Sequence, residues 1–289
     1  MTLLAIVLAL VAERFLGVLE DYRRWDWLDR YLDWLGAKAG EDGVVKDVAI
    51  LGLGIFLPAL LLYAVVWSLG DILFLFELAA GAVILVYCLG PKSFYDQVKE
   101  FCASSDNGNQ ESAIWYLESI LGRTITQNEA RSLNRTMAEN LFVLAHERIF
   151  ALLFWFLILG PFGAVVYRAL RRASEKLGSA EESKDSWVHQ LAYLAAWPSS
   201  RLLSIIYGVT GNFVEGVAGF KNKGKDCSAY WTDPNDRVLV CSGSGAIGLK
   251  TDQDTLDTGV IRGAIALIRR SILFFVGLIA LMTLSGWMV

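Results

Sequence analysis

The sequence has few of the residues that metal sites and nucleic-acid-binding surfaces use. It contains two histidines, His146 and His189, and four cysteines that lack the close spacings of a zinc site: Cys88, Cys102, Cys227 and Cys241. Lys and Arg number 26 against 30 Asp and Glu, so the net charge is −4 and no long basic stretch occurs. We therefore expect neither a structural metal nor a nucleic-acid partner.

Apolar residues, by contrast, are abundant. The chain of 289 residues is 55% hydrophobic and 19% charged, and its mean hydropathy is +0.44. These values are too apolar for an ordinary soluble domain and too charged for a protein made only of membrane spans. They indicate an integral membrane protein with sizeable polar segments.

Long apolar runs locate the predicted spans. A span needs roughly 20 residues to cross ~30 Å of hydrocarbon, and four runs approach that length: 48–69, 71–90, 149–167 and 271–289. Residues 3–19 lack a basic start and a cleavage site, which predicts an uncleaved membrane-associated helix. Residues 191–210 contain Pro198 and Arg201, so we expect a buried or interfacial helix there.

The predicted fold class is therefore an all-α membrane protein, a single domain over 1–289. It is a bundle of four to five apolar helices with cytoplasmic amphipathic helices in the polar segments 20–47, 91–148 and 168–270. Within the last segment, residues 221–259 are rich in Gly, Ser, Asp and Thr and are predicted to be loop, with RVLVC as a short strand. GSGAIG fits a dinucleotide-binding pattern only formally, because no strand–helix–strand unit surrounds it.

The third run is interrupted at Gly160-Pro161-Phe162-Gly163. Proline removes a helical hydrogen bond and glycines permit a sharp break. The run is therefore either a kinked span or a re-entrant hairpin, and both interpretations stay open.

The motif around this break, HERIFALLFWFLILGPFGAVVYRALRRAS, resembles the AmpE family of bacterial inner-membrane proteins. The first residues, MTLLAIVLALVAERFLG, and the later AWPSSRLLSIIYGVTGNFVEG are similar to the same family. The resemblance implies a multi-pass protein of the bacterial inner membrane. It further implies a regulatory or signalling modulator of AmpC β-lactamase induction, linked to the recycling of cell-wall fragments.

More distantly, the chain resembles the CobD/CbiB superfamily, whose enzymes use ATP and Mg²⁺ to join an amino alcohol phosphate to a carboxylate. Positions where that resemblance implies polar or acidic groups carry Arg171, Ser174, Ala192 and Tyr193 here. We therefore predict no catalytic residue and no cofactor. Two alternatives remain: an ATP-dependent amide ligase, and a binding or transport module for a cell-wall amphiphile.

Two sets of charged and polar residues are candidates for function. Arg135, Glu139 and His146 share a helix face next to Asn140, which indicates either a site or an ordinary solvated face. The superfamily resemblance adds positions suited to an anionic ligand, with Glu139 expected within ~4 Å of Arg168 or Arg201. The ligand-binding candidates are Arg135, Glu139, Asn140, His146, Tyr167, Arg168 and Arg201.

Three further charges fall inside apolar runs, namely Glu13, Arg14 and Glu77. A charge within the membrane is costly, so each is expected to be paired or functional. Glu77 is expected either to pair with Arg14 or Arg148 or to be protonated and neutral. The partners predicted for the whole chain are the lipid bilayer and a small anionic or cell-wall-derived ligand. Assembly into a homo-oligomer is left open.

Basic residues flank 168–270 at both ends, which predicts that this segment faces the cytoplasm. An impermeant maleimide added to intact cells should then leave Cys227 unmodified, as read by mass spectrometry. Rapid labelling, or an oxidised bridge between Cys227 and Cys241, would contradict this orientation.

Overall fold

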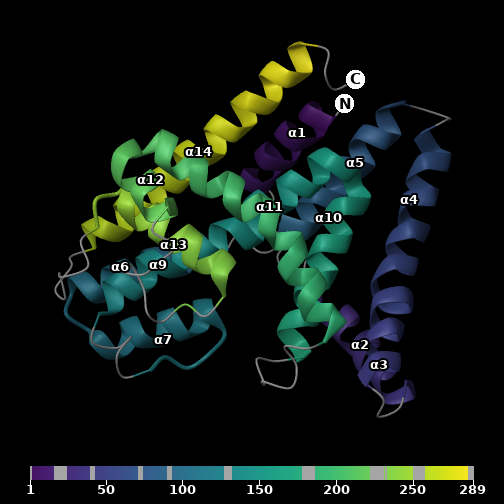
Figure 1. Cartoon of the computed structure of the whole chain (residues 1–289), viewed down its shortest axis with the longest axis horizontal. Coiled ribbons are helices and arrows are strands. Elements are labelled where there is room, and N and C mark those ends of the chain that lie inside the picture. The colour runs from purple at the N-terminus through teal and green to yellow at the C-terminus, as the bar shows by residue number, and fades with distance from the viewer. Residues whose placement is uncertain are drawn as a thin grey trace. The chain divides into compact units, whose positions relative to one another are not determined.

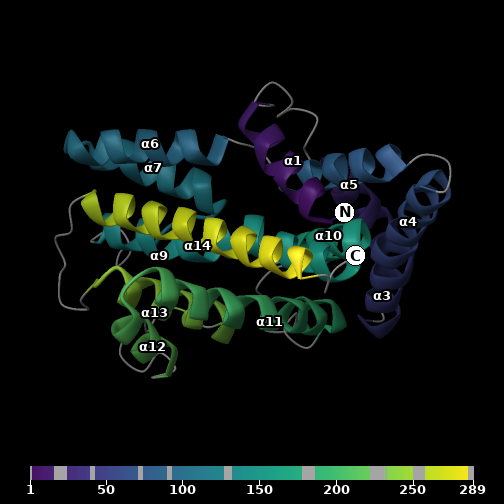
Figure 2. The same cartoon turned by 90° about the horizontal axis from the view of Figure 1, so that it is seen from above.

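The computed structural model describes residues 2–15, 25–39, 43–70, 74–89, 93–126, 132–177, 186–221, 231, 233–249 and 258–285. The described elements are all helices, and no strand occurs among these residues (Figures 1 and 2). Three helical runs are long and apolar enough to cross a membrane: Val44–Ser68, Leu133–Leu177 and Gly259–Leu284. Leu3–Ala12 and Leu78–Leu89 are shorter apolar helices. The chain is an all-α membrane protein, as predicted.

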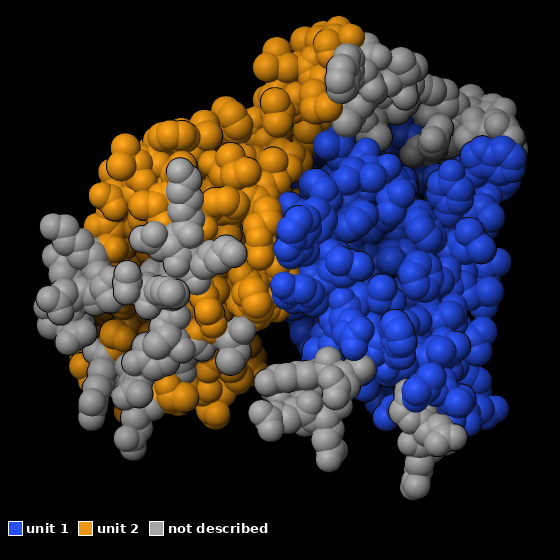
Figure 3. Space-filling model, viewed as in Figure 1, with its two compact units in different colours: residues 1–91, 151–198, 289 blue, residues 92–150, 199–288 orange. Residues whose placement is uncertain are grey.

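The chain forms two compact units (Figure 3). Unit 1 comprises residues 1–91, 151–198 and 289, and unit 2 comprises 92–150 and 199–288. Each unit is therefore assembled from separate stretches of the sequence. That 1–289 acts as one domain stays a prediction.

Unit 1 contains the elements α1 (Thr2–Phe15), α2 (Asp26–Lys38), α3 (Gly43–Ala49), the π-helix η3 (Ile50–Phe56), α4 (Leu57–Gly70), α5 (Phe74–Leu89), α10 (Ala151–Leu177) and the first half of α11 (Trp187–Thr210). The adjacent helices α4 and α5 pack against each other, and α10 packs on both. Exposed side chains on the α4 run are large and apolar, for example Leu60, Leu61 and Trp67. A surface of this kind suits lipid better than water.

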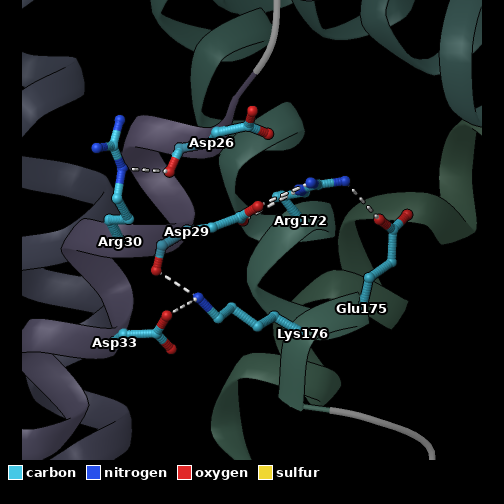
Figure 4. A network of polar contacts seen from close by, with 7 residues as sticks. All are labelled: Asp26, Asp29, Arg30, Asp33, Arg172, Glu175 and Lys176. Atoms are coloured by element: carbon cyan, nitrogen blue, oxygen red, sulfur yellow. Dashed lines mark hydrogen bonds and ion pairs between the residues drawn. The ribbon is translucent and has the colours of Figure 1, made fainter.

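Ion pairs fasten α2 to α10 (Figure 4). Arg172 donates from Nε and Nη2 to the two carboxylate oxygens of Asp29, at 3.1 and 2.8 Å. One turn later, Lys176 Nζ lies 2.7 Å from Asp33 Oδ2 and also donates to the Asp29 carbonyl oxygen. A two-pronged guanidinium–carboxylate contact fixes orientation as well as distance. The network therefore sets the position of α2 along α10.

Unit 2 contains α6 (Ser93–Asp106), α7 (Gln110–Leu121), α9 (Leu133–Ala145), the π-helix η4 (His146–Phe150), the second half of α11, α12 (Phe213–Lys221), α13 (Pro234–Ala246) and α14 (Gly259–Leu284). α6 packs on α7, while α9 packs on both α13 and α14. The C-terminal helix begins at Gly259, earlier than the apolar run predicted from residue 271. Its first turns carry arginines, which hydropathy alone assigns to a polar segment.

Glycines bring α12 and α13 into backbone contact, and the two helices lie side by side in both views (Figures 1 and 2). A Cβ added at Gly219 would lie 2.3 Å from the Cys241 carbonyl oxygen, and one at Gly245 would lie 2.5 Å from that of Glu215. Such close approach excludes any larger residue. We call this α12–α13 contact the glycine seam.

The loop and strand predicted for 221–259 are wrong where the structure describes that segment. RVLVC and the first four residues of GSGAIG lie in the helix α13, and Gly248 follows it with φ +71°. Asp233 caps this helix by accepting from the Asn235 backbone N–H, and Pro234 occupies its first turn. The glycines of α13 allow close packing against α12 at the glycine seam, and they do not mark a flexible loop.

The helix α11 buries polar as well as apolar side chains. Its buried positions include Ser199 and Ser200 beside Leu203 and Tyr207, whereas Leu194 is exposed. That the segment 191–210 is buried in the protein or lies at the membrane interface stays a prediction.

Charges predicted within the membrane can be placed only in part. Glu13, Arg14 and Glu77 lie on α1 and α5, but their side chains fall outside the described residues, so their pairing stays a prediction.

Cys241 is disulfide-bonded, whereas Cys88 and Cys102 are free thiols. Cys227 lies outside the described residues. Because disulfides persist in oxidising compartments, this bond runs against the cytoplasmic placement of 168–270 that the flanking arginines predict. Mass spectrometry of non-reduced protein from maleimide-treated intact cells decides between the two, because a bridged Cys227 is oxidised and cannot react, whereas a cytoplasmic Cys227 is an unlabelled free thiol.

The glycine seam makes a prediction about stability. Gly245→Ala should lower the thermal unfolding temperature of the detergent-solubilised protein, because its methyl group would overlap a backbone carbonyl and overpacking costs about 1–3 kcal/mol. Gly277→Ala on α14 is the matched control, since nothing lies within 4 Å of a Cβ there and alanine favours helix by about 1 kcal/mol. Equal effects of the two substitutions would contradict the seam.

Candidate functional site

Unit 2 encloses a set of polar side chains that a lipid-facing protein would not bury without hydrogen bonds. They come from α9, η4, α11 and α13, and Trp231 adds a contact just before α13. We call this set the polar core: Arg135, Glu139, Asn140, His146, Ser199, Ser200, Arg201, Trp231 and Asn235.

Glu139 is a buried carboxylate with a donor on each oxygen. Arg135 Nε lies 2.9 Å from its Oε1, and Trp231 Nε1 donates to Oε2 at 3.2 Å. Arg237 holds Trp231 in turn, donating from Nε and Nη2 to its carbonyl oxygen at 3.0 and 2.9 Å. The sequence predicts the Arg135–Glu139 pair correctly, and the face that it occupies is turned into the protein instead of into water.

Arg201 is oriented by two neutral groups. Its Nη1 donates to Ser200 Oγ at 3.1 Å and to Asn235 Oδ1 at 3.2 Å. Asn235 is itself fixed, because its backbone N–H donates to the capping carboxylate of Asp233 at 2.7 Å. The guanidinium is half-buried. A planar, permanently charged donor held in this way suits a carboxylate or phosphate.

His146 and Ser199 form a third contact. His146 Nε2 and Ser199 Oγ are 2.8 Å apart, and both residues are almost fully buried. His146 begins the π-helical turn η4, and turns of this kind occur often at functional positions. The pair joins the end of α9 to α11 inside unit 2.

Apolar packing supports the polar core from one side. The Tyr207 ring contacts Phe142 with centroids 5.3 Å apart, and its hydroxyl donates to the Phe142 carbonyl oxygen at 3.4 Å. Burial raises the pKa of Tyr207 above its usual value. Tyr207 therefore stays neutral and acts as a fixed donor.

The remaining predicted residues divide between the units. Asn140 donates from Nδ2 to the Thr136 carbonyl oxygen at 2.8 Å in unit 2. Tyr167 and Arg168 lie on α10 in unit 1, and the Arg168 Nε is buried without a hydrogen-bond partner among the described residues. The convergence of Arg168 with Glu139 stays a prediction. Arg201 contacts Ser200 and Asn235 in unit 2, and its approach to Glu139 stays a prediction as well.

Four members of the polar core escape prediction from sequence: Ser199, Ser200, Trp231 and Asn235. Only Asn235 has a local signal, since Asp233-Pro234 is a helix start that would place it on the first turn of α13. Within the described residues, no group of three or more His, Cys, Asp or Glu side chains is placed to hold a metal ion.

Comparison with known proteins agrees with part of the resemblance. The family described as CobD/Cbib protein matches residues 6–255. A protein named cobalamin biosynthesis protein CobD from Chromobacterium violaceum is 25% identical over 190 residues, which cover 63% of this chain and 58% of that protein. A protein of the same name from Stutzerimonas stutzeri is 23% identical over 173 residues, covering 59% and 56% respectively.

The chain thus aligns with somewhat more than half the length of these curated relatives. No solved structure matches it. Because the family match extends from the first helix to beyond α13 and takes in the whole polar core, the chain belongs to the CobD/CbiB family.

Proposed function

We propose that this protein is a multi-pass regulator of the bacterial inner membrane that recognises an anionic, cell-wall-derived ligand through its polar core. This is the role that the resemblance to AmpE implies, in β-lactamase induction and the recycling of cell-wall fragments. In this proposal, recognition replaces the ATP-dependent ligation that the resemblance to the CobD/CbiB enzymes implies. The chain would share its fold with the CobD/CbiB family and differ from the ligases in the side chains at the motif positions.

The Arg172–Asp29 contact is the observation that carries this proposal. Arg171 and Arg172 stand where the resemblance to the ligases implies asparagine and threonine, and Ser174 stands where it implies aspartate. Arg172 makes a two-pronged ion pair with Asp29 on α2, and Arg171 lies 3.7 Å from Glu175. Both arginines are therefore engaged in joining or bracing helices, which is a structural task.

Recognition is supported by the way in which Arg201 is held. Hydrogen bonds to Ser200 and Asn235 orient its Nη1, and a guanidinium carries five N–H donors in all. The carboxylate of Glu139 already accepts from Arg135 and Trp231. A ligand with a carboxylate or phosphate would thus meet a fixed cation at Arg201, while the negative charge of Glu139 is balanced by its own donors.

One rival keeps a specific observation in its favour. Both relatives are named for cobalamin biosynthesis, and Glu139 and Asn140 match two motif positions of the ligase resemblance. An ATP-dependent amide ligase is therefore the second candidate function.

Binding can be measured as thermal stabilisation of the solubilised protein by an anhydro-muropeptide without nucleotide. A ligand at 100 times its Kd stabilises the folded state by about 2.7 kcal/mol, which is readily seen as a rise in the unfolding temperature. We expect Arg201→Gln to weaken binding at least tenfold, because a hydrogen bond to a charged group contributes about 1.5–3 kcal/mol.

Arg262→Gln is the matched control for that loss. Arg262 also lies in unit 2, but it is exposed and pairs with Asp106 at 3.1 Å, outside the polar core. Wild-type binding should survive this change. An equal loss in both variants would indicate a general charge effect and would contradict recognition by Arg201.

The rival predicts a reaction instead of binding alone. We expect the purified protein to form no adenosylcobinamide phosphate from adenosylcobyric acid, aminopropanol phosphate, ATP and Mg²⁺, as assayed by mass spectrometry. Product above a no-enzyme control, absent in Glu139→Gln, would establish the ligase and remove the regulatory proposal.

A further inference from the structure

The helix α10 contains a break that changes how it can sit in a membrane. Gly160 has φ 64° and ψ −153°, a conformation outside the helical region, and Pro161 follows it. The break separates a first limb, 151–159, from a second limb, 161–177. Glycine adopts this backbone conformation without the strain that a side chain would add. Proline suits the first turn of the new limb because it has no N–H to leave unsatisfied.

The second limb turns back toward the first. A Cβ built on Gly163 would lie 2.4 Å from the Trp155 carbonyl oxygen and 2.7 Å from the Leu159 Cβ. In an uninterrupted helix, residues 155 and 163 would be separated by about 12 Å along the axis. The two limbs therefore form a sharp helical hairpin whose tip is Gly160.

Neither limb is long enough to cross a bilayer. Arg148 precedes the tip on the same helical run, and Arg168 follows it on the second limb. At 1.5 Å per residue, the apolar lengths between each arginine and the tip are roughly 18 and 12 Å. The hydrocarbon core is about 30 Å thick, so each limb reaches about half its depth.

The tip presents apolar surface beside a helix that does have the length of a span. Ile158 and Leu159 are 55% and 46% exposed, and nothing lies within 4 Å of a Cβ at Gly160. Next to it, Phe162 stacks edge-on against Tyr63 of the 25-residue run Val44–Ser68, with centroids 6.1 Å apart. On α5, Gly81 accommodates Phe156 and Pro161. The hairpin is thus held within unit 1 at the depth of α4 and α5.

We propose that α10 is a re-entrant hairpin that enters one leaflet of the bilayer and returns to the side from which it came. The acyl layer of that leaflet surrounds Ile158 and Leu159, and the two limbs leave this layer at the levels of Arg148 and Arg168. Residues 92–148 and the segment after Arg168 then share one side of the membrane. This inference does not depend on the proposed function.

Single cysteines introduced into the full-length chain show on which side of the membrane each position lies. Asn107→Cys lies in the exposed turn between α6 and α7, Glu175→Cys on the exposed face of the second limb, and Ser68→Cys at the end of the α4 run. Intact cells are treated with an impermeant maleimide, and peptide-resolved mass spectrometry reads each engineered thiol separately from the native ones. Gln190→Cys, exposed on α11, is a second reporter beyond the hairpin if Glu175→Cys reduces expression.

We expect the maleimide to label Asn107→Cys and Glu175→Cys at similar rates. The labelling rate of Ser68→Cys should differ from both by at least tenfold, because it lies on the other side of the membrane. Ser68→Cys is the internal control, since the run 71–90, which the sequence predicts to be a span, separates it from both. Glu175→Cys responding like Ser68→Cys would show that α10 crosses the bilayer. A uniform response of all three would also overturn the proposal.

Discussion

Lipid offers no hydrogen bonds, and this constraint organises both units. A polar group turned toward hydrocarbon stays unsatisfied, so polar side chains point inward and find one another. In unit 2, Ser199 is bonded to His146 while Ser200 and Arg201 share Asn235. In unit 1, Asp29 and Arg172 meet across two helices. Large apolar residues such as Trp67 and Leu281 stay outside. The interior is therefore specified by hydrogen-bond partners as much as by shape.

Sequence reasoning succeeds here where a signal is local and repeated. Apolar runs reveal membrane helices, and the spacing of Arg135 and Glu139 reveals an ion pair, because both depend on neighbours within a few residues. It fails at α13, where glycine and serine resemble a loop until α12 is packed against them. Trp231 and Ser199 join the site through contacts 92 and 53 residues away, a separation that no periodicity reveals.

The proposed function treats the family scaffold and the chemistry of its site as separable. The chain has the break at Gly160, and its Arg171 and Arg172 form ion pairs with Glu175 and Asp29. Under this proposal, a bracing group in place of a ligand-facing one leaves the fold intact and removes a contact that catalysis would need. A superfamily can change its function by such exchanges because fold and site are under different physical demands.

The glycine seam also limits rotation. Two helices whose backbones touch cannot turn about their axes without forcing a carbonyl oxygen into a Cα, so α13 has a single angular setting against α12. Asn235 stands on the first turn of α13, and that setting decides where its side-chain oxygen is aimed. The oxygen receives a hydrogen bond from Arg201. The close contacts of Gly219 and Gly245 therefore help to fix the orientation of the Arg201 guanidinium, through the position of Asn235 on α13.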